Sequence, residues 1–259
     1  MLCSVRNLSV RYNEQDKDVV RQVNLSINDG GTTALIGESG SGKTTLALAM
    51  MGLLDPRNGA TVSGSMVFQD EPVTLDSKGL SPLRGRHIGF IFQEPLLALN
   101  PLFTMGAQLM QVLTWHHIPQ PKIKAKSWLE RVGLLPVDRI YKLYPHQLSG
   151  GMRQRAMIAL ALAAGPELII ADEPTSGIDA VLRQDIMDLL AHLTDEHSGL
   201  LLITHDLAVA ANYSQHIHVM QSGVIVESGE TDRIIREPRH DYTRLLVDYY
   251  IKSVASLSN

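Results

Sequence analysis

The segment Gly37-Glu-Ser-Gly-Ser-Gly-Lys-Thr44 restricts the possible folds of this chain more than any other feature. It follows a short β-rich run, residues 32–36, and precedes an apolar run with helical spacing, residues 46–54. A Gly-x-x-x-x-Gly-Lys-Thr loop between a strand and a helix is typical of phosphate binding, because its glycines let successive backbone N–H groups face phosphate oxygens. The N-terminus of the following helix adds a positive potential. An α/β fold with a nucleoside triphosphate site is therefore predicted.

The residues of this loop have separate predicted tasks. The Lys43 ammonium is expected to reach the β and γ phosphates, and the Thr44 hydroxyl is expected to ligate Mg²⁺. ATP and Mg²⁺ are therefore the expected ligands. The alternative is a Gly/Ser-rich surface turn with a chance lysine, which the flanking strand and helix disfavour. The predicted phosphate-binding residues are Gly37, Glu38, Ser39, Gly40, Ser41, Gly42, Lys43, Thr44 and Thr45.

An acidic pair, Asp172 and Glu173, directly follows the unbroken apolar run 168–171. Such a run suits a parallel strand that is covered on both faces, and ligands bind beyond the carboxyl ends of these strands. Asp172 is predicted to hold Mg²⁺ through water, and Glu173 to polarise the attacking water. For either acid alone, the alternative is a solvated charge at a strand end.

Two more polar residues, Gln93 and His205, also follow predicted strands. Gln93 is a candidate Mg²⁺ ligand and sensor of the γ-phosphate, and His205 is a candidate contact for the γ-phosphate or the attacking water. Taken alone, such side chains are more often solvent-facing or structural. Together with Lys43, Asp172 and Glu173, they all fall just past strand ends, where open α/β sheets bind ligands. This shared position favours a functional role.

A second candidate phosphate site is Leu148-Ser-Gly-Gly-Met-Arg-Gln-Arg155. Ser149 is predicted to N-cap a helix that starts near Gly151, and its hydroxyl and the adjoining N–H groups form an anion site. The alternative is an ordinary helix cap. Because the chain cannot bring this segment to its own phosphate loop, we expect ATP to lie between two subunits.

A block of helices interrupts the alternation of strands and helices. In it, prolines at 119, 121, 136 and 145 are expected to separate the helices. Strands are predicted at 5–12, 19–27, 32–36, 65–68, 87–92, 168–171, 200–203, 217–220 and 224–227. Helices are predicted at 46–54, 103–115, 122–132, 151–164, 181–193, 231–236, N-capped by Thr231, and 242–254. The pattern predicts a core of residues 1–93 and 165–259, with an inserted helical subdomain of residues 94–164.

Composition limits the remaining possibilities. The net charge of −4 lacks the basic excess of a general nucleic-acid binder, so no nucleic-acid partner is expected. Cys3 is the only cysteine, which excludes a disulfide framework and a cysteine-ligated cluster. The N-terminus lacks the pattern of a secretory signal, and no apolar run approaches the ~18–20 residues that span a bilayer. A membrane role would therefore require partner chains.

These motifs, in this order, resemble those of the ATP-binding cassette family. They are Walker A at 37–44, the Q-loop at Gln93, the signature at 148–154, Walker B at 168–173 and the switch histidine His205. The resemblance covers nearly the whole chain. It implies a P-loop NTPase core of mainly parallel sheet, with an N-terminal antiparallel β subdomain and an inserted α-helical subdomain.

The resemblance also implies roles for individual residues. Tyr12 would stack on adenine, and Asp179 would be the D-loop acid at the dimer seam. Ser149, Gly150, Gly151 and Gln154 of the signature would face ATP held by the partner subunit. Lys43, Gln93, Glu173 and His205 would form the catalytic set, with Glu173 as general base, and Thr44, Gln93 and Asp172 would bind the metal. The D-loop has Gly177 where alanine is more usual, which is expected to loosen the seam.

Two segments resemble the peptide/nickel importer group, residues 92–104 and 238–246, although Asp241 replaces a usual proline. The resemblance implies an ATPase (a translocase) that drives uptake of nickel, a metal chelate or an oligopeptide. The implied partners are a second ATP-binding subunit, expected to be a different chain with a homodimer as the alternative, two transmembrane permease subunits and, indirectly, a solute-binding protein. The chain ends without a cysteine-rich tail, so no iron–sulfur cluster is expected. The implied location is peripheral, on the cytoplasmic face of the inner or plasma membrane.

Other functions share part of this pattern. The nearest alternative is the ATPase of an exporter or a lipoprotein-release system. A nucleotide or small-molecule kinase would share the phosphate loop but not the segment 148–154. A nucleic-acid- or ribosome-acting cassette would usually carry tandem cassettes, long coiled coils or basic linkers. A non-hydrolysing regulatory cassette is disfavoured by the intact Glu173 and His205.

Overall fold

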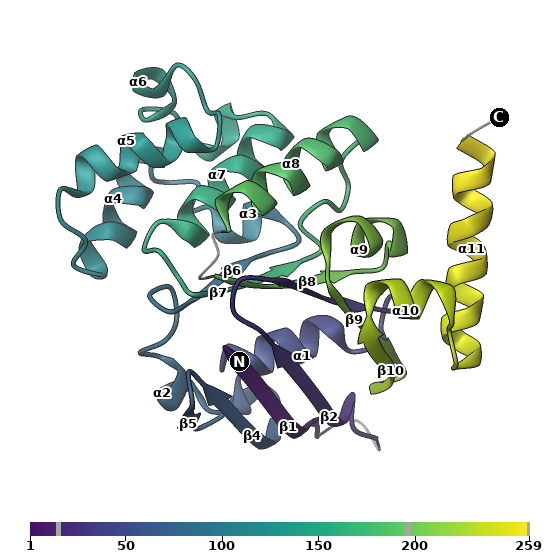
Figure 1. Ribbon diagram of the computed structural model, residues 1–259. Coiled ribbons are helices and arrows are strands. Elements are labelled where there is room, and N and C mark those ends of the chain that lie inside the picture. The colour runs from purple at the N-terminus through teal and green to yellow at the C-terminus, as the bar shows by residue number, and fades with distance from the viewer. Residues whose placement is uncertain (14–16, 195–197, 258–259) are drawn as a thin grey trace. The chain divides into compact units, whose positions relative to one another are not determined.

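A computed structural model describes residues 1–13, 17–194 and 198–257 of the chain (Figure 1). The chain divides into two compact units, one made of Met1–Pro82 with Gly199–Asn259 and the other of Leu83–Ser198. The predicted helical subdomain, residues 94–164, falls within the second unit. The boundaries predicted for it and for the core stay predictions.

An antiparallel sheet forms the N-terminal part of the first unit, with strand order β2-β1-β4-β5. Period-two alternation in the sequence produces strands with one buried and one exposed face. The strands are β1 (Cys3–Tyr12), β2 (Val20–Ile27), β4 (Ala60–Phe68) and β5 (Glu71–Val73). The prediction placed the start of β4 at Ser65. The strand begins earlier because Gly59, with φ of 76°, ends the preceding turn directly before Ala60.

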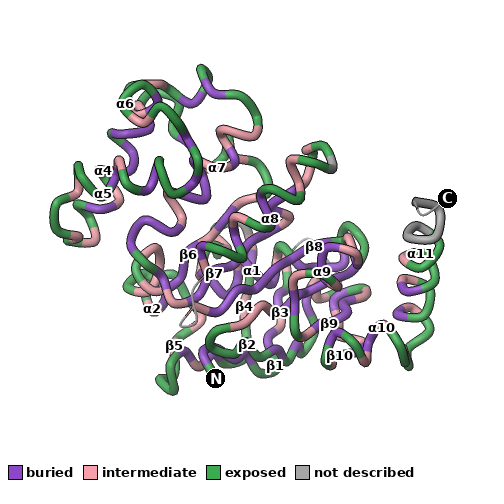
Figure 2. The backbone as a smooth tube through the Cα atoms, turned by 45° about the horizontal axis from the view of Figure 1, so that its top comes forward, coloured by how far each residue is buried: buried purple, intermediate pink, exposed green. Residues whose placement is uncertain are grey.

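The first unit also contains four strands in the order β10-β9-β3-β8. β3 pairs in parallel with both neighbours, so that Ala34 lies opposite Leu202 and Ile217. The strands are β3 (Thr32–Ile36), β8 (Gly199–Thr204), β9 (His216–Gln221) and β10 (Val224–Glu230). β9 and β10 form the predicted hairpin. β8 is buried along its whole length (Figure 2), as its unbroken apolar run predicts.

The helices of the first unit flank these strands. They are α1 (Lys43–Met50), the 3₁₀ helix η1 (Pro56–Asn58), α2 (Ser77–Leu80), α9 (Leu207–Tyr213), α10 (Thr231–Arg236) and α11 (Asp241–Leu257). The prediction missed α2 and α9, which are short helices capped by Asp76 and Asp206. The prediction that Thr231 caps α10 was wrong. Glu230 occupies the N-cap position, and the Thr231 hydroxyl donates to the Ser214 carbonyl oxygen at 2.7 Å.

The second unit combines two parallel strands with helices. The strands are β6 (Ile88–Ile91) and β7 (Leu168–Asp172), paired so that Ile88 lies opposite Leu168. The helices are α3 (Pro95–Ala98), α4 (Met105–Trp115), α5 (Pro121–Arg131), α6 (Val137–Ile140), η2 (Pro145–Gln147), α7 (Gly150–Leu162) and α8 (Ala180–Leu193). Three of these begin at a proline, and two of the three, Pro121 and Pro145, were expected to separate the helices. Proline is tolerated in the first helical turn because an N–H group there would have no acceptor within the helix.

One hydrophobic cluster of the first unit bears on the site. Val247 of α11 is 3% exposed and packs with Ala34 and Ile36 of β3, while Tyr242, Leu246 and other side chains cover the cluster in part. α11 is thereby joined to the strand that leads into the phosphate loop. Of the helices that the structure describes, none has the length and apolar character needed to cross a membrane.

Candidate nucleotide-binding and hydrolysis site

The phosphate loop of the first unit connects β3 to α1, the predicted context for this motif. α1 begins at Lys43, and Gly42 precedes it with φ of 104° in the left-handed region. A side chain at Gly42 would be strained in that conformation, and its Cβ would lie 2.9 Å from the Val19 carbonyl oxygen. The glycine thus lets the loop turn directly into the helix, whose first N–H groups have no partner within the helix.

Lys43 is held inside the loop and is only 5% exposed. Its Nζ donates to the carbonyl oxygens of Gly37 and Glu38, both at 2.9 Å. The Ser41 hydroxyl is buried, and no described residue is its hydrogen-bond partner. A buried ammonium, a buried hydroxyl and a helix N-terminus together fit an anionic ligand such as a phosphate group.

A residue that is not among the predicted site residues contacts the same loop. The backbone N–H of Glu38 donates to the hydroxyl oxygen of Tyr242, at 2.9 Å. Tyr242 belongs to the first turn of α11. Burial raises the pKa of Tyr242 above the ordinary value of a phenol. The separation of about 200 positions in the sequence leaves no local signal from which this contact could be predicted.

The other predicted site residues of the first unit lie at the ends of elements. Tyr12 is half-buried at the end of β1, and Thr44 is exposed in the first turn of α1. His205 is exposed and directly follows β8, as predicted. Their proposed contacts with adenine, metal and γ-phosphate stay predictions.

In the second unit, β7 carries the acidic pair at its carboxyl end. Asp172 is the last residue of the strand and is 3% exposed, while Glu173 is half-buried with φ of 45°. Nε2 of Gln93 lies 3.4 Å from Oε2 of Glu173 and 3.2 Å from Oγ of Ser176. The structure therefore brings Gln93 and Glu173 together, two residues that are 80 positions apart.

The signature segment forms the N-terminus of α7, as predicted. Ser149 is the N-cap, and its Oγ accepts a hydrogen bond from the Met152 N–H at 3.3 Å. Ser149 and Gly150 are exposed. Gln154 is different, because its side chain is 3% exposed and its amide donates to the Pro174 carbonyl oxygen. The helix is thus tied to the turn that follows Glu173.

The D-loop lies between β7 and α8. Asp179 N-caps α8, and its Oδ1 accepts from the Leu182 N–H at 3.0 Å. Gly177 has φ of 72°, a left-handed conformation in which alanine would be strained. A cavity of about 260 Å³ lies where this loop, the start of α7 and the residues after Gln93 meet.

The geometry agrees with what comparison with known proteins shows. A model of the ABC transporter family matches residues 20–176. The oligopeptide transport ATP-binding protein OppD of Lactococcus lactis subsp. cremoris is 42% identical over 235 residues, covering 88% of this chain and 69% of that protein. The dipeptide transport ATP-binding protein DppD of Haemophilus influenzae is 41% identical over 254 residues, covering 95% of this chain and 76% of that protein. The solved dimer of an ATP-binding cassette in a post-hydrolysis state, bound to ADP and Pi, is 28% identical with a TM-score of 0.76, covering 89% of this chain and 99% of that chain.

A phosphate loop on β3 and α1, together with an acidic pair at the end of β7, defines a nucleotide-hydrolysing α/β protein. The chain belongs to the ABC transporter family, and it is an ATP-binding cassette ATPase of that family. The predicted family and the predicted P-loop α/β fold class are confirmed.

Proposed function

We propose that this chain is the ATP-hydrolysing subunit of an importer that takes up peptides. The similarity to oligopeptide and dipeptide transport ATP-binding proteins extends over 88–95% of the chain and supports this function. It favours peptide uptake over nickel or metal-chelate uptake, and import over export or lipoprotein release. The observation that carries the hydrolytic role is the turn after β7, which presents Glu173 beside the Gln93 amide.

In this proposal the first unit binds the nucleotide. The Lys43 ammonium, which the Gly37 and Glu38 carbonyl oxygens hold inside the loop, donates its remaining N–H to the β and γ phosphates. Tyr12 stacks on adenine, and residues 37–45 supply N–H groups and hydroxyls to the phosphates. Thr44 is the ligand that this unit offers to Mg²⁺, which when bound supplies positive charge against the triphosphate.

The second unit supplies the hydrolytic groups and the signature. Glu173 acts as general base toward the attacking water, Gln93 and Asp172 complete the metal ligands, and His205 of the first unit contacts the γ-phosphate. Ser149, Gly150 and Gly151, at the N-terminus of α7, face ATP that is bound by a second ATP-binding subunit. Asp179 lies at the seam between the two subunits. Because the site is complete only in the dimer, hydrolysis is gated by dimer closure.

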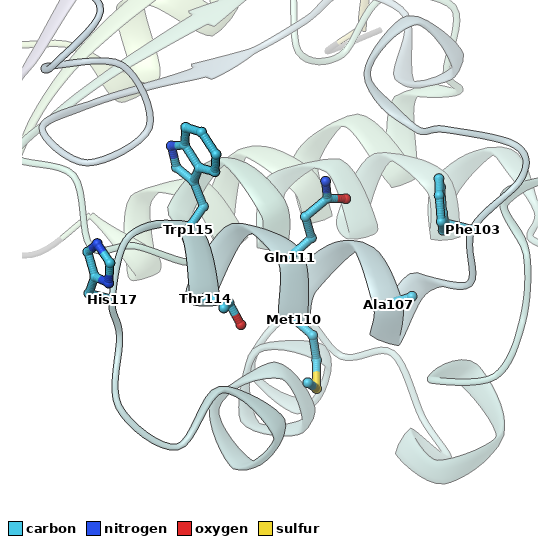
Figure 3. A pocket seen from close by; sticks show the side chains of 7 residues that line it. All are labelled: Phe103, Ala107, Met110, Gln111, Thr114, Trp115 and His117. Atoms are coloured by element: carbon cyan, nitrogen blue, oxygen red, sulfur yellow. The ribbon is translucent and has the colours of Figure 1, made fainter.

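An exposed apolar surface of the second unit is the proposed contact with membrane subunits. Leu97 and Leu102 are 76% and 79% exposed, and Trp115 at the end of α4 is 79% exposed. A pocket of about 730 Å³ extends along α4 from Phe103 to His117. Figure 3 shows Phe103, Gln111 and Trp115 projecting to the same side of this segment. Several exposed large apolar side chains on one stretch of the chain favour a protein interface, and two permease subunits would place the chain peripherally at the cytoplasmic face of the membrane.

Uptake by the assembled transporter tests this function. The chain, its second ATPase subunit, the permeases and the solute-binding protein are reconstituted in vesicles, and uptake of a labelled dipeptide, a labelled oligopeptide and Ni²⁺ is measured with and without ATP. We expect ATP-dependent uptake of a peptide, and no uptake with Lys43→Ala. Peptide-independent uptake of Ni²⁺, or movement of solute in the export direction, would contradict the proposal.

A further inference from the structure

We propose that Tyr242 is a positioning residue for the phosphate loop, and that through it the C-terminal helix α11 sets the affinity of the site for ATP. The Glu38 N–H donates a hydrogen bond to the Tyr242 hydroxyl oxygen, at 2.9 Å. The inference rests on the proposed role of Gly37–Thr44 in binding phosphate. It adds a residue outside every motif that defines the site.

The contacted peptide group is the one that also holds the catalytic lysine. The N–H of Glu38 and the C=O of Gly37 belong to the same peptide group, and this carbonyl oxygen accepts from Lys43 Nζ at 2.9 Å. Because a peptide group is planar, its N–H and C=O rotate together. The Tyr242 hydroxyl therefore fixes the orientation of the carbonyl oxygen that receives the Lys43 ammonium. The two bonds also polarise each other through the peptide group.

The residues that directly precede Tyr242 are hydrogen-bonded to β10. The Glu227 side chain is 6% exposed and accepts hydrogen bonds from the backbone N–H groups of Arg239 and His240, at 3.1 and 2.9 Å. Arg233 Nη1 adds an ion pair with Glu227 at 3.3 Å. The Tyr242 N–H in turn donates to Nδ1 of His240, at 3.2 Å. A buried carboxylate thus holds the start of α11 in place.

The tyrosine ring is fixed from a second direction by packing. Tyr242 and Leu246 pack against the buried cluster that contains Val247 of α11 and Ala34 and Ile36 of β3. In the described part of α11, Thr243 and Val247 are buried among exposed positions (Figure 2). Because β3 leads directly into the loop, the helix and the loop share one rigid support. Loss of the hydroxyl alone should leave this packing intact.

The expected consequence is a change in nucleotide affinity without a change in chemistry. A peptide group that is free to rotate must be ordered again when ATP binds, and this ordering lowers affinity. The ground state and the transition state lose the same interaction, so KM should rise while kcat stays unchanged. A residue that only stabilised the fold would instead lower the amount of active protein, and hence the apparent kcat, with KM unchanged.

The test compares Tyr242→Phe with Tyr249→Phe, which removes an exposed hydroxyl from the same helix. Binding of a non-hydrolysable ATP analogue to the full-length chain is measured by calorimetry, and KM and kcat for ATP are measured in the assembled transporter. Tyr242→Phe should weaken binding and raise KM by about three- to tenfold, the range for loss of one hydrogen bond, with kcat within about twofold of wild type. Tyr249→Phe should match wild type. Equal affinity of Tyr242→Phe and wild type, or a loss confined to kcat, would overturn the inference.

Lys43→Ala separates failure of this inference from failure of the proposed function. If Lys43→Ala binds the analogue as wild type does, the phosphate-binding role of the loop Gly37–Thr44 is wrong, and the proposed function is wrong as well. If Lys43→Ala loses binding while Tyr242→Phe keeps wild-type affinity, only the role of Tyr242 is rejected.

Discussion

The side-chain amide nitrogen of Gln93 lies 3.4 Å from Oε2 of Glu173, the proposed general base. The same amide is 3.2 Å from Oγ of Ser176, so it spans the turn that follows β7. Gln93 also precedes the segment with the exposed side chains Leu97 and Leu102. If a membrane partner displaced that segment, the Gln93 side chain would therefore transmit the movement to the Glu173 carboxylate.

Gln93→Leu should lower hydrolysis and its stimulation by peptide while leaving ATP binding intact. The variant removes the amide that contacts the Glu173 carboxylate, and loss of one hydrogen bond corresponds to about three- to tenfold in rate. ATPase activity of the assembled transporter is measured with and without peptide and binding protein. Gln184→Leu, which changes an exposed glutamine on α8, is the control and should behave as wild type. Full peptide stimulation in Gln93→Leu would contradict this role.

Gln154→Leu should both destabilise the chain and slow hydrolysis. Without the amide, the Pro174 carbonyl oxygen loses its buried donor, which costs about 1–3 kcal/mol. The matched control is Gln108→Leu on α4, a 7% exposed glutamine whose amide donates to the Asn100 and Phe103 carbonyl oxygens. Urea unfolding should show comparable decreases in the free energy of unfolding for Gln154→Leu and Gln108→Leu. Only Gln154→Leu should lower the turnover of folded ATPase in the absence of permease, and equal turnover of the two variants would show that the Pro174 contact has no effect on the site.

Phe103→Asp should prevent assembly with the permeases without affecting ATP binding. Phe103 is 48% exposed and lines the pocket along α4, so a carboxylate there would have to be desolvated in an apolar interface. Copurification with tagged permease is the measurement. Ile123→Asp, at a 64% exposed position of α5, gives the same chemical change outside this pocket and should still assemble. Wild-type recovery of Phe103→Asp would remove this surface from the proposed interface.

Stability should fall on acidification because of His218. This residue of β9 is 4% exposed, and burial lowers its pKa from 6.5 to about 4, with a further contribution from His216. The unfolded chain therefore binds a proton between pH 6.5 and 4 that the folded chain does not. His218 has no effect above this window, and the free energy of unfolding decreases within it by about 1.4 kcal/mol per pH unit.

Urea unfolding at pH 7.5 and pH 5 measures this effect. At pH 5, protonation of His218 in the unfolded chain should lower the free energy of unfolding by about 2 kcal/mol relative to pH 7.5. His218→Gln should not show this decrease. The control is His192→Gln, which changes an exposed histidine of α8. Between pH 7.5 and pH 5 its free energy of unfolding should fall by as much as that of wild type. An equal loss in His218→Gln and wild type would contradict the assignment.

The sequence was sufficient for the parts of the site that depend on local patterns. The loop at Gly37–Thr44, the cap at Ser149 and the strand before Asp172 each follow from a few adjacent residues, and the structure has them where they were predicted. Short elements were harder. α3 and η2 are three or four residues long, so a period of 3.6 has no room to appear in them.

Contacts between distant segments were beyond prediction from one sequence. The bonds of Gln154 to Pro174 and of Glu38 to Tyr242 join residues whose neighbours carry no sign of the pairing. Thr231 illustrates the same limit. Its position and type predicted a helix cap, but the tertiary structure places the Ser214 carbonyl oxygen within reach of its hydroxyl.

The decisive measurement is ATP hydrolysis by Glu173→Gln. The variant keeps the size and shape of the side chain that follows β7 but removes its basicity. ATP turnover and ATP binding of the assembled transporter are compared for wild type, Glu173→Gln and Glu130→Gln, the last at an exposed position of α5. The proposed role of Glu173 as general base predicts that Glu173→Gln binds ATP as wild type does and hydrolyses it about 10²–10⁴ times more slowly, with Glu130→Gln unchanged. Hydrolysis by Glu173→Gln at the wild-type rate would contradict it.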